Sequence, residues 1–99
     1  MSQNITSKVE SQVDLGAGHF LMRLAAPEIA PVAKAGEFVM IGIPDIDAML
    51  IRRPFSIARV PPDPAEGRPR SIDILYKVFG QRTAAFSALG PGAELSLLG

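Results

Sequence analysis

The chain has 99 residues, of which 47% are hydrophobic and 20% are charged, and ten basic side chains balance ten acidic ones. These figures describe one folded domain, and the balanced charge leaves no overall field that would attract nucleic acid. The chain has no cysteine, which excludes disulfides, thiolate metal sites and a cysteine-ligated iron–sulfur cluster within these residues.

Short apolar or alternating segments separated by turn-forming clusters predict an antiparallel all-β domain. The first two expected strands run from Ser7 to Asp14 and from His19 to Ala25. The LGAG between them can reverse the chain, because Gly16 and Gly18 tolerate positive φ. The third strand, Glu37 to Ile43, is almost continuously apolar, which predicts that both of its faces are buried.

The second half of the chain predicts three more strands. The segment from Arg53 to Val60 ends at PPDPAEGRPR, whose prolines exclude a central strand or a helix interior. The segment from Ser71 to Val78 alternates most clearly, and Ala93 to Leu98 is the last expected strand. Between them, QRTAAFSALGPG predicts one short helix with Thr83 as its N-cap and Gly90 after its last turn.

The fold class follows from these six strands and one short helix. They favour an all-β, six-stranded antiparallel barrel with a Greek-key crossing, because an open six-stranded sheet would leave two exposed edges. Residues 1–99 are expected to form this single domain. No apolar run approaches the roughly 18 residues of a membrane span, and the first residues lack a signal or transit pattern. We therefore expect a cytoplasmic domain with no membrane span and no nucleic-acid partner.

The stretch LIRRPFSIARV, residues 50–60, sets two adjacent arginines in an otherwise apolar strand. Strand alternation predicts one face with Arg53, Phe55, Ile57 and Arg59, and an opposite face with Arg52, Pro54, Ser56 and Ala58. Arg53 and Phe55 are then neighbours, a planar cation beside an aromatic ring, which suits a ligand with an anionic part and a flat aromatic part. The alternative is that the arginines form surface ion pairs and that Phe55 belongs to the core.

A second candidate site begins at Gly80, in the stretch YKVFGQRTAAF. A helix start behind a glycine turn offers unpaired backbone N–H groups with a partial positive charge, which can bind an anion. Arg82 and the Thr83 hydroxyl are further donors there. The alternative is an ordinary capped helix without a ligand.

The order RRPFSIARV, IDILYKVFGQRTAAFSAL and GPGAELSLLG resembles the flavin-binding domain of the ferredoxin reductase superfamily. More narrowly, it resembles the electron transfer subunit of bacterial dihydroorotate dehydrogenase, over nearly the whole chain. Such families carry an Arg-x-aromatic-Ser signature on a barrel strand and a Gly-x-x-Thr or Gly-x-x-Ser helix start, both directed at FAD. The first is matched by Arg53, Pro54, Phe55 and Ser56, and the second by Gly80 through Thr83.

The resemblance implies a role in FAD binding for each matched segment. Arg53 would pair with the FAD pyrophosphate, Phe55 would pack against the ribityl chain or the isoalloxazine ring, and Ser56 would hydrogen-bond near flavin N5 and O4. Thr83 and the helix start would complete the phosphate site. The segment expected to lie along the cofactor consists of Leu75, Tyr76, Lys77 and Val78.

Two details of this assignment stay open. Strict alternation turns the Ser56 side chain away from Phe55, so either a twist at Pro54 or use of the Ser56 backbone N–H is needed. Arg82 stands where the narrower family often has glycine, and it either adds a phosphate contact or points to solvent.

The resemblance also implies parts that residues 1–99 lack. Full members continue into an NAD-binding domain, and the dihydroorotate branch adds a cysteine cluster that holds a [2Fe–2S] centre. The chain would then be the FAD-binding part of an electron-transfer subunit that links NAD(H), through the missing domain, to a catalytic dihydroorotate dehydrogenase subunit in pyrimidine biosynthesis. The fragment alone would be an incomplete oxidoreductase with no catalytic side chain.

Two other functions remain open from the sequence. One is the flavin domain of a related sulfide dehydrogenase, hydrogenase or transhydrogenase. The other is a β-barrel module without a redox role that binds an oligonucleotide or a peptide.

Overall fold

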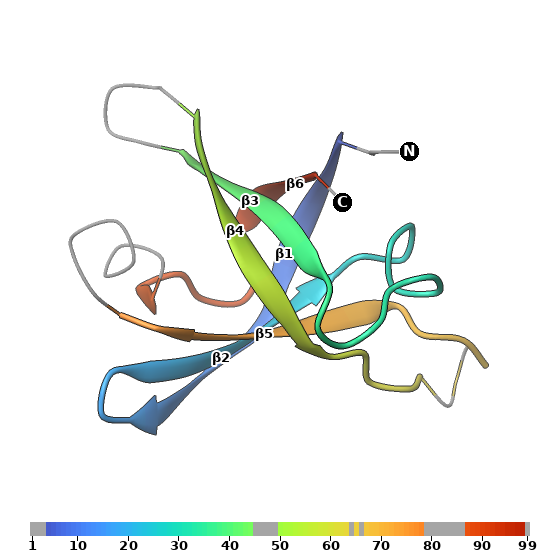
Figure 1. The fold of residues 1–99 in the computed structure, drawn as a ribbon, viewed down its shortest axis with the longest axis horizontal. Coiled ribbons are helices and arrows are strands. Elements are labelled where there is room, and N and C mark those ends of the chain that lie inside the picture. Colours follow the sequence, from blue (N-terminus) through green and yellow to red (C-terminus); the bar gives the residue numbers. More distant parts are fainter. Residues whose placement is uncertain (1–3, 45–49, 64, 66, 79–86, 99) are drawn as a thin grey trace.

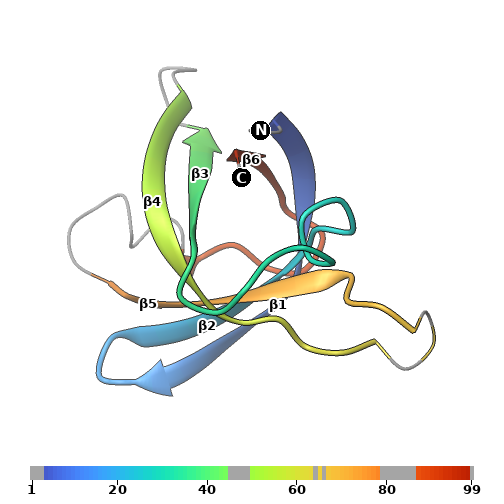
Figure 2. The same ribbon diagram turned by 45° about the vertical axis from the view of Figure 1, so that its right-hand side comes forward.

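The computed structural model describes residues 4–44, 50–63, 65, 67–78 and 87–98. Within these ranges six antiparallel strands close into a barrel in the spatial order β1-β2-β5-β4-β3-β6 (Figures 1 and 2). The strands are β1 Asn4–Gly16, β2 His19–Ala25, β3 Phe38–Pro44, β4 Leu50–Arg59, β5 Ser71–Lys77 and β6 Glu94–Leu98. Because β2 neighbours β5 and β3 neighbours β6, the predicted six-stranded Greek-key barrel is confirmed. The short helix predicted after Gly80 falls mostly on residues 79–86, outside the described residues.

The barrel interior is filled by side chains that alternate along the strands. The buried strand residues are Val9, Met22, Leu24, Val39, Ile41, Phe55, Ile57, Ile72, Ile74, Tyr76, Leu95 and Leu97. The turn after β2 adds Ala26, Ile29 and Ala30, and the Ala26 carbonyl accepts the Ile29 and Ala30 N–H groups at 3.1 and 2.8 Å. Each large apolar side chain buried in this way stabilises the fold by about 1.5–3 kcal/mol. Burial therefore supplies the stability that disulfides give to other small domains.

The β1–β2 hairpin turns through three consecutive residues with positive φ. Gly16, Ala17 and Gly18 have φ of 88°, 55° and 81°. The two glycines adopt this region without steric cost, as predicted for the reversal. β1 runs beyond its predicted ends because its first half pairs with β6 and its second half with β2.

The prediction that β3 is buried on both faces was wrong. Val39 and Ile41 lie in the core, but Phe38 is 72% exposed and Met40 is only partly buried. The barrel is a single layer of strands, so no second layer covers the outer face of β3 in the described part of the chain. The apolar run of β3 therefore combines residues that face the core with residues that face the outer surface.

A β-bulge in β4 changes which face Arg59 occupies. Ile57 pairs with Ile74 and Arg59 pairs with Asp73, so Ala58 has no counterpart in β5. Strict alternation predicted Arg59 on the same face as Phe55, but the extra residue turns Arg59 to the outer surface beside Asp73. That part of the prediction was wrong. Upstream of the bulge, Phe55 is buried and Pro54 and Ser56 are exposed, as alternation requires.

Candidate functional site

Two of the predicted site segments lie on adjacent strands. The ring centroids of Phe55 on β4 and Tyr76 on β5 are 6.0 Å apart, and the ring planes meet at 82° in an edge-to-face contact. The segments 53–56 and 75–78 therefore meet at the same end of the β4–β5 pair. The third segment, with Gly80, Arg82 and Thr83, lies outside the described residues, so its place in the site stays a prediction.

β4 and β5 diverge where these segments meet. Their pairing holds at Ile57 and Arg59 of β4 and, within the described ranges, does not extend to Arg53. Figure 1 shows the first half of β4 rising with β3 while β5 continues in another direction. The ladder ends at Ile57, and Pro54 keeps it from resuming further along β4. The Ile57 N–H donates to the Glu37 carbonyl on the β3 side at 2.8 Å. Because successive N–H groups of a strand point to opposite neighbours, the nitrogen of residue 54, three positions away, faces β5. Proline has no N–H to donate there.

Arg53 is exposed at this divergence and forms no ion pair with any residue in the described part of the chain. Other arginines behave differently, because Arg23 and Arg59 each pair with a carboxylate. The surface ion pair of the alternative is therefore not realised for Arg53 among these residues, whereas its other half is, because Phe55 belongs to the core. Its guanidinium keeps its donors for an external anion.

The Ser56 side chain lies on the outer surface. β4 pairs with β3 from Leu50 to Ser56 without a register shift, so there is no bulge at Pro54 that would turn the hydroxyl toward Phe55. Of the two ways in which Ser56 was expected to reach a flavin, a twist at Pro54 is absent from the structure. In the other segment, Leu75 and Lys77 point outward and Val78 is partly buried.

Tyr76 points into the barrel and connects three strands. Its ring stacks on Phe20 at 5.8 Å, and its hydroxyl donates to Gln12 Oε1 at 2.6 Å. Gln12 in turn donates from Nε2 to the Leu89 carbonyl at 3.1 Å. No sequence pattern pointed to Gln12, because a register shift between Val9 and Ser11 changes the phase of β1 and turns this polar residue inward.

The hydroxyl of Tyr76 is expected to lose its proton at a higher pH than an exposed tyrosine does. Burial raises the pKa of Tyr76 to about 12, against about 10 in an unfolded chain. The stability linked to this group is complete below about pH 10 and is lost as the pH rises toward 12. Tyr76 is the chain's one tyrosine and there is no tryptophan, so an alkaline absorbance titration reports on it directly. A midpoint near that of the denatured protein would contradict the buried hydroxyl.

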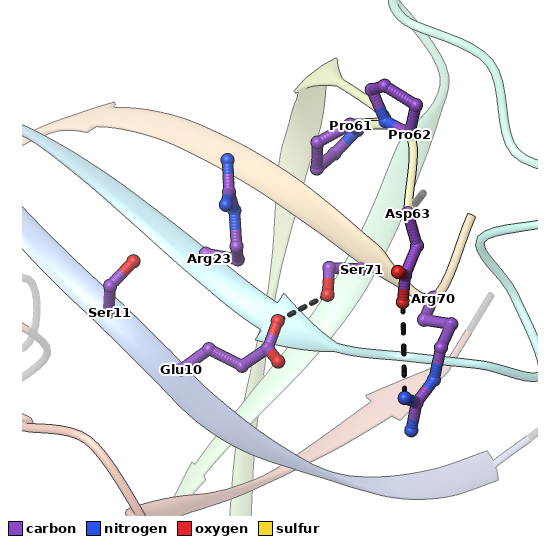
Figure 3. Close-up of a pocket in the computed structure, with 8 residues that line it drawn as sticks. All are labelled: Glu10, Ser11, Arg23, Pro61, Pro62, Asp63, Arg70 and Ser71. Atoms are coloured by element: carbon purple, nitrogen blue, oxygen red, sulfur yellow. Dashed lines mark hydrogen bonds and ion pairs between the residues drawn. The ribbon is translucent and has the colours of Figure 1, made fainter. Parts of the chain in front are cut away.

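A hollow of about 380 Å³ lies at the opposite end of the β4–β5 pair (Figure 3). It is lined by Glu10, Ser11, Arg23, Pro61, Pro62, Asp63, Arg70 and Ser71. Its charges largely compensate one another, because the Ser71 hydroxyl donates to the Glu10 carboxylate and Arg70 Nη1 lies 4.0 Å from Asp63 Oδ2. None of the predicted site residues that the structure describes lines it, so it is separate from the β4–β5 part of the candidate site.

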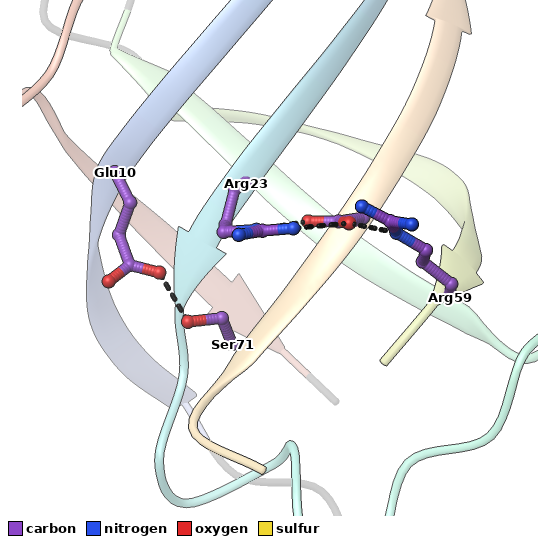
Figure 4. A network of polar contacts seen from close by, with 5 residues as sticks. Glu10, Arg23, Arg59 and Ser71 are labelled. Atoms are coloured by element: carbon purple, nitrogen blue, oxygen red, sulfur yellow. Dashed lines mark hydrogen bonds and ion pairs between the residues drawn. The ribbon is translucent and has the colours of Figure 1, made fainter. Parts of the chain in front are cut away.

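A buried carboxylate joins three strands beside this hollow. Asp73 on β5 is fully buried, and Arg23 on β2 donates to it from Nε at 2.8 Å and from Nη2 at 3.1 Å. Arg59 on β4 donates from Nε at 2.6 Å. Figure 4 shows Arg23 and Arg59 reaching toward each other across β5. Burial of Asp73 disfavours its charge, but hydrogen bonds from Arg23 and Arg59 outweigh burial and lower its pKa. This cluster fixes the β2-β5-β4 layer that carries the candidate site.

Comparison with known proteins identifies relatives by sequence. Three of them are named dihydroorotate dehydrogenase B (NAD(+)), electron transfer subunit. The Streptococcus pneumoniae R6 protein is 34% identical over 95% of this chain and 34% of its own length. The proteins of Streptococcus mutans and Desulforamulus reducens are 35% and 30% identical over the full chain and 35% and 36% of their own lengths. The chain thus spans about a third of the length of these relatives. No protein-family model matches it.

Solved structures share the barrel at lower sequence identity. A ferredoxin NADP+ reductase from Neisseria gonorrhoeae with bound FAD and NADP superposes with a TM-score of 0.75 and 17% identity, over 95% of this chain and 36% of that one. A siderophore utilization protein from T. fusca gives a TM-score of 0.76 and 17% identity, over 99% and 44%. No helix in the described ranges has the length and apolar character needed to span a bilayer. The chain is therefore a homologue of dihydroorotate dehydrogenase B electron transfer subunits over about a third of their length, with the barrel fold of ferredoxin reductases.

Proposed function

We propose that this chain binds FAD and forms the flavin domain of an electron-transfer subunit in a dihydroorotate-oxidising enzyme. The observation that carries the proposal is 30–35% identity to subunits of that name over 95% or more of the chain. The geometry of the candidate site fits the cofactor. Arg53 offers donors for a pyrophosphate, and the Phe55 ring lies two residues away at the divergence of β4 and β5.

The residues of the diverging strands would hold FAD between them. Arg53 would bind the pyrophosphate. Phe55 is buried against Tyr76, so it would support the flavin or its ribityl chain from the core side. Pro54 and Ser56 are exposed and would allow close approach of the cofactor. On β5, Leu75, Lys77 and Val78 flank the cofactor, while Tyr76 supports it from inside the barrel. Gly80, Arg82 and Thr83 would complete the phosphate site.

FAD supplies hydride acceptance from NAD(H) and the release of single electrons to an iron–sulfur centre. The residues of this chain bind and orient the cofactor, and no side chain is required as a general acid or base. In this proposal the NAD(H) site, the [2Fe–2S] centre and the contact with the catalytic dihydroorotate dehydrogenase subunit belong to a longer protein. Co-purification of that catalytic subunit with the longer protein would identify the electron acceptor.

Reconstitution with FAD tests the cofactor assignment. We expect the apo chain to take up FAD, to show flavin absorbance after removal of free cofactor, and to melt at a higher temperature. At a hundredfold excess of ligand over Kd, binding to the folded state adds about 2.7 kcal/mol of stability. Riboflavin, which lacks phosphates for Arg53, should stabilise the chain less than FAD does. A chain that stays colourless and gains no thermal stability would instead favour a β-barrel module without a redox role.

A further inference from the structure

The aliphatic row, made of Val13, Leu21 and Leu75, crosses the outer face of β1, β2 and β5. Val13 pairs with Leu21, and Leu21 pairs with Leu75, so the three side chains stand directly beside one another. Val13 is 47% exposed and Leu75 is 49% exposed, while Leu21 between them is partly buried. Single exposed apolar residues are common on protein surfaces, whereas adjoining ones mark contact sites. The row is therefore a candidate contact surface.

The strand that carries the centre of the row has no free edge. β2 pairs with β1 along one side and with β5 along the other, from His19 to Ala25. A partner therefore cannot add a strand here and has to contact side chains. The Met22 and Leu24 side chains on the opposite face of β2 are fully buried, so the row lies on a packed support.

Positively charged side chains border the aliphatic row on both sides. On one side, Arg23 and Arg59 share the buried Asp73 carboxylate, while their own side chains remain 36% and 62% exposed (Figure 4). On the other side, Lys77 is exposed, lies opposite His19 and forms no ion pair within the ranges that the structure describes. An incoming surface would therefore meet cations on either side of the aliphatic centre.

The carboxylates near the row do not cancel this charge. Glu10 accepts the Ser71 hydroxyl at the border of the arginine side. Asp14 pairs with Phe20 and so belongs to the opposite face of the sheet. Together with Asp73, Glu10 gives two carboxylates against the three cations of the border, which leaves an excess of one positive charge when His19 is neutral.

An aliphatic centre with a cationic border fits a protein surface that has an apolar centre and a carboxylate rim. An apolar core inside a polar rim is typical of subunit contacts, and complementary charge selects the partner. A second copy of this chain would bring like charges together, because a two-fold contact uses the same patch twice. A membrane fits less well, because lipid-binding patches carry clusters of about four to eight basic residues, whereas this chain has no net charge.

We propose that the aliphatic row and its cationic border form the docking surface for another subunit, which presents aliphatic side chains ringed by aspartate or glutamate. This inference rests on the proposed function, in which that partner is the catalytic dihydroorotate dehydrogenase subunit. Val13 and Leu21 lie on strands that carry none of the predicted site residues. The docking surface is thus centred away from the divergence of β4 and β5, and it can be tested without changing the candidate cofactor site.

Opposite charges at position 13 test the surface in the complex of the longer protein with the catalytic subunit. We expect Val13→Glu to raise the Kd of this complex about a hundredfold, because it removes an apolar contact and sets a carboxylate against an acidic rim. Val13→Lys loses the same apolar contact but adds a cation, so its Kd should rise only about tenfold. Wild-type affinity in Val13→Glu, or equal affinity in the two variants, would overturn the proposal.

Val32→Glu is the matched control for these variants. Val32 is 77% exposed on the turn that follows β2, and Figure 1 shows this turn at the opposite end of β2 from the β1–β2 hairpin. The same substitution there should leave the Kd of the complex within about twofold of wild type. A loss as large as that of Val13→Glu would show that added negative charge acts wherever it is placed, and would overturn the assignment to the aliphatic row.

A second measurement does not depend on a charged variant. The 99-residue chain has no cysteine, so Val13→Cys can carry a single environment-sensitive dye. Addition of the catalytic subunit should shift the emission of this dye to the blue, because the row becomes covered by apolar side chains. The same dye on Val32→Cys should show no shift. Unchanged emission from position 13 would overturn the proposal.

Other occupants of the row give different results. Dimerisation of the chain that Val13→Glu abolishes would assign the row to a second copy. Binding of the chain to vesicles of phosphatidylcholine and phosphatidylserine that Val13→Lys strengthens would assign it to a membrane. Either result would overturn the proposed subunit contact.

FAD uptake separates this inference from the proposed function. A protein that takes up FAD, and whose Val13→Glu variant binds the catalytic subunit as wild type does, would lose the docking surface and keep the proposed function. A protein that takes up no FAD would overturn the proposed flavin role, and the position 13 variants would then judge the docking surface by the Kd of the complex alone.

Discussion

Arg53→Ala is expected to weaken FAD binding by about 1.5–3 kcal/mol, which is roughly a tenfold to 150-fold rise in Kd. The loss follows from removal of a charge-assisted contact to the pyrophosphate. The variant should unfold within about 0.5 kcal/mol of wild type, because Arg53 is exposed and has no ion pair with a described residue. Calorimetric titration with FAD and chemical denaturation of the apo chain measure the two quantities separately.

Arg68→Ala is the matched control for Arg53→Ala. It removes the same charge from an exposed position on the proline-rich loop, at the far end of the β4–β5 pair. Its Kd for FAD should equal that of wild type, so a general loss of positive charge cannot explain the Arg53 effect. Equal affinity of Arg53→Ala and wild type would remove Arg53 from the cofactor site.

Asp73→Asn is expected to lower the free energy of unfolding by about 2–4 kcal/mol. The carboxylate is fully buried and accepts three hydrogen bonds from Arg23 and Arg59, which an amide of the same shape cannot accept equally. Urea denaturation measures the loss. Asp63→Asn is the control, because its ion pair with Arg70 is long and partly exposed and should contribute less than about 1 kcal/mol.

The Asp73 effect should also depend on pH in one direction. The pKa of Asp73 is lowered in the folded state, since the two arginines outweigh the cost of burial. Its contribution is therefore complete above the unfolded value of about 3.9 and is lost as the pH falls through the lower folded value. The stability gap between wild type and Asp73→Asn should be constant above about pH 5 and should narrow below about pH 4. A gap that stays constant down to pH 2 would show that the carboxylate acts through shape alone.

The strand pattern of this barrel is largely readable from its sequence. Turn-forming residues mark the strand ends clearly, so that His19–Ala25 was predicted with its observed bounds. The proline-rich loop likewise predicted the break between β4 and β5. Closure of the six strands into a barrel was predicted from edge protection, whereas the order of the strands around it comes from the structure. The strand segments are local features, and barrel closure follows from the number of strands. Predicting them therefore requires no knowledge of side-chain partners.

The wrong face for Arg59 and the failure to identify Gln12 both arose where pairing changes the phase of a strand. The bulge at Ala58 moved Arg59 to the outer surface, and the shift near Glu10 brought Gln12 into the barrel. A bulge depends on which strand lies alongside, and a single sequence does not show this. The same holds for Phe38, whose exposure depends on the absence of a covering layer in the described structure.

The candidate site was predictable in part for the same reason. Arg53 and Phe55 were identified from alternation within one strand, and the structure brings Phe55 against Tyr76. The register alone shows that β4 and β5 are neighbours and that their pairing ends at Ile57. The roles of Gly80, Arg82 and Thr83 remain predictions.

The pairing of β1 with β6 has a consequence for how this domain folds. Asn4 lies opposite Leu98, so the barrel closes through contacts between the two most distant strands in the chain. Such contacts require loop-closure entropy to be lost before they are formed, which slows folding to milliseconds or longer. Until Leu95 and Leu97 dock, β1 and β3 both expose unpaired edges that can associate with other chains. The interval before β6 docks is therefore the period in which aggregation competes with folding.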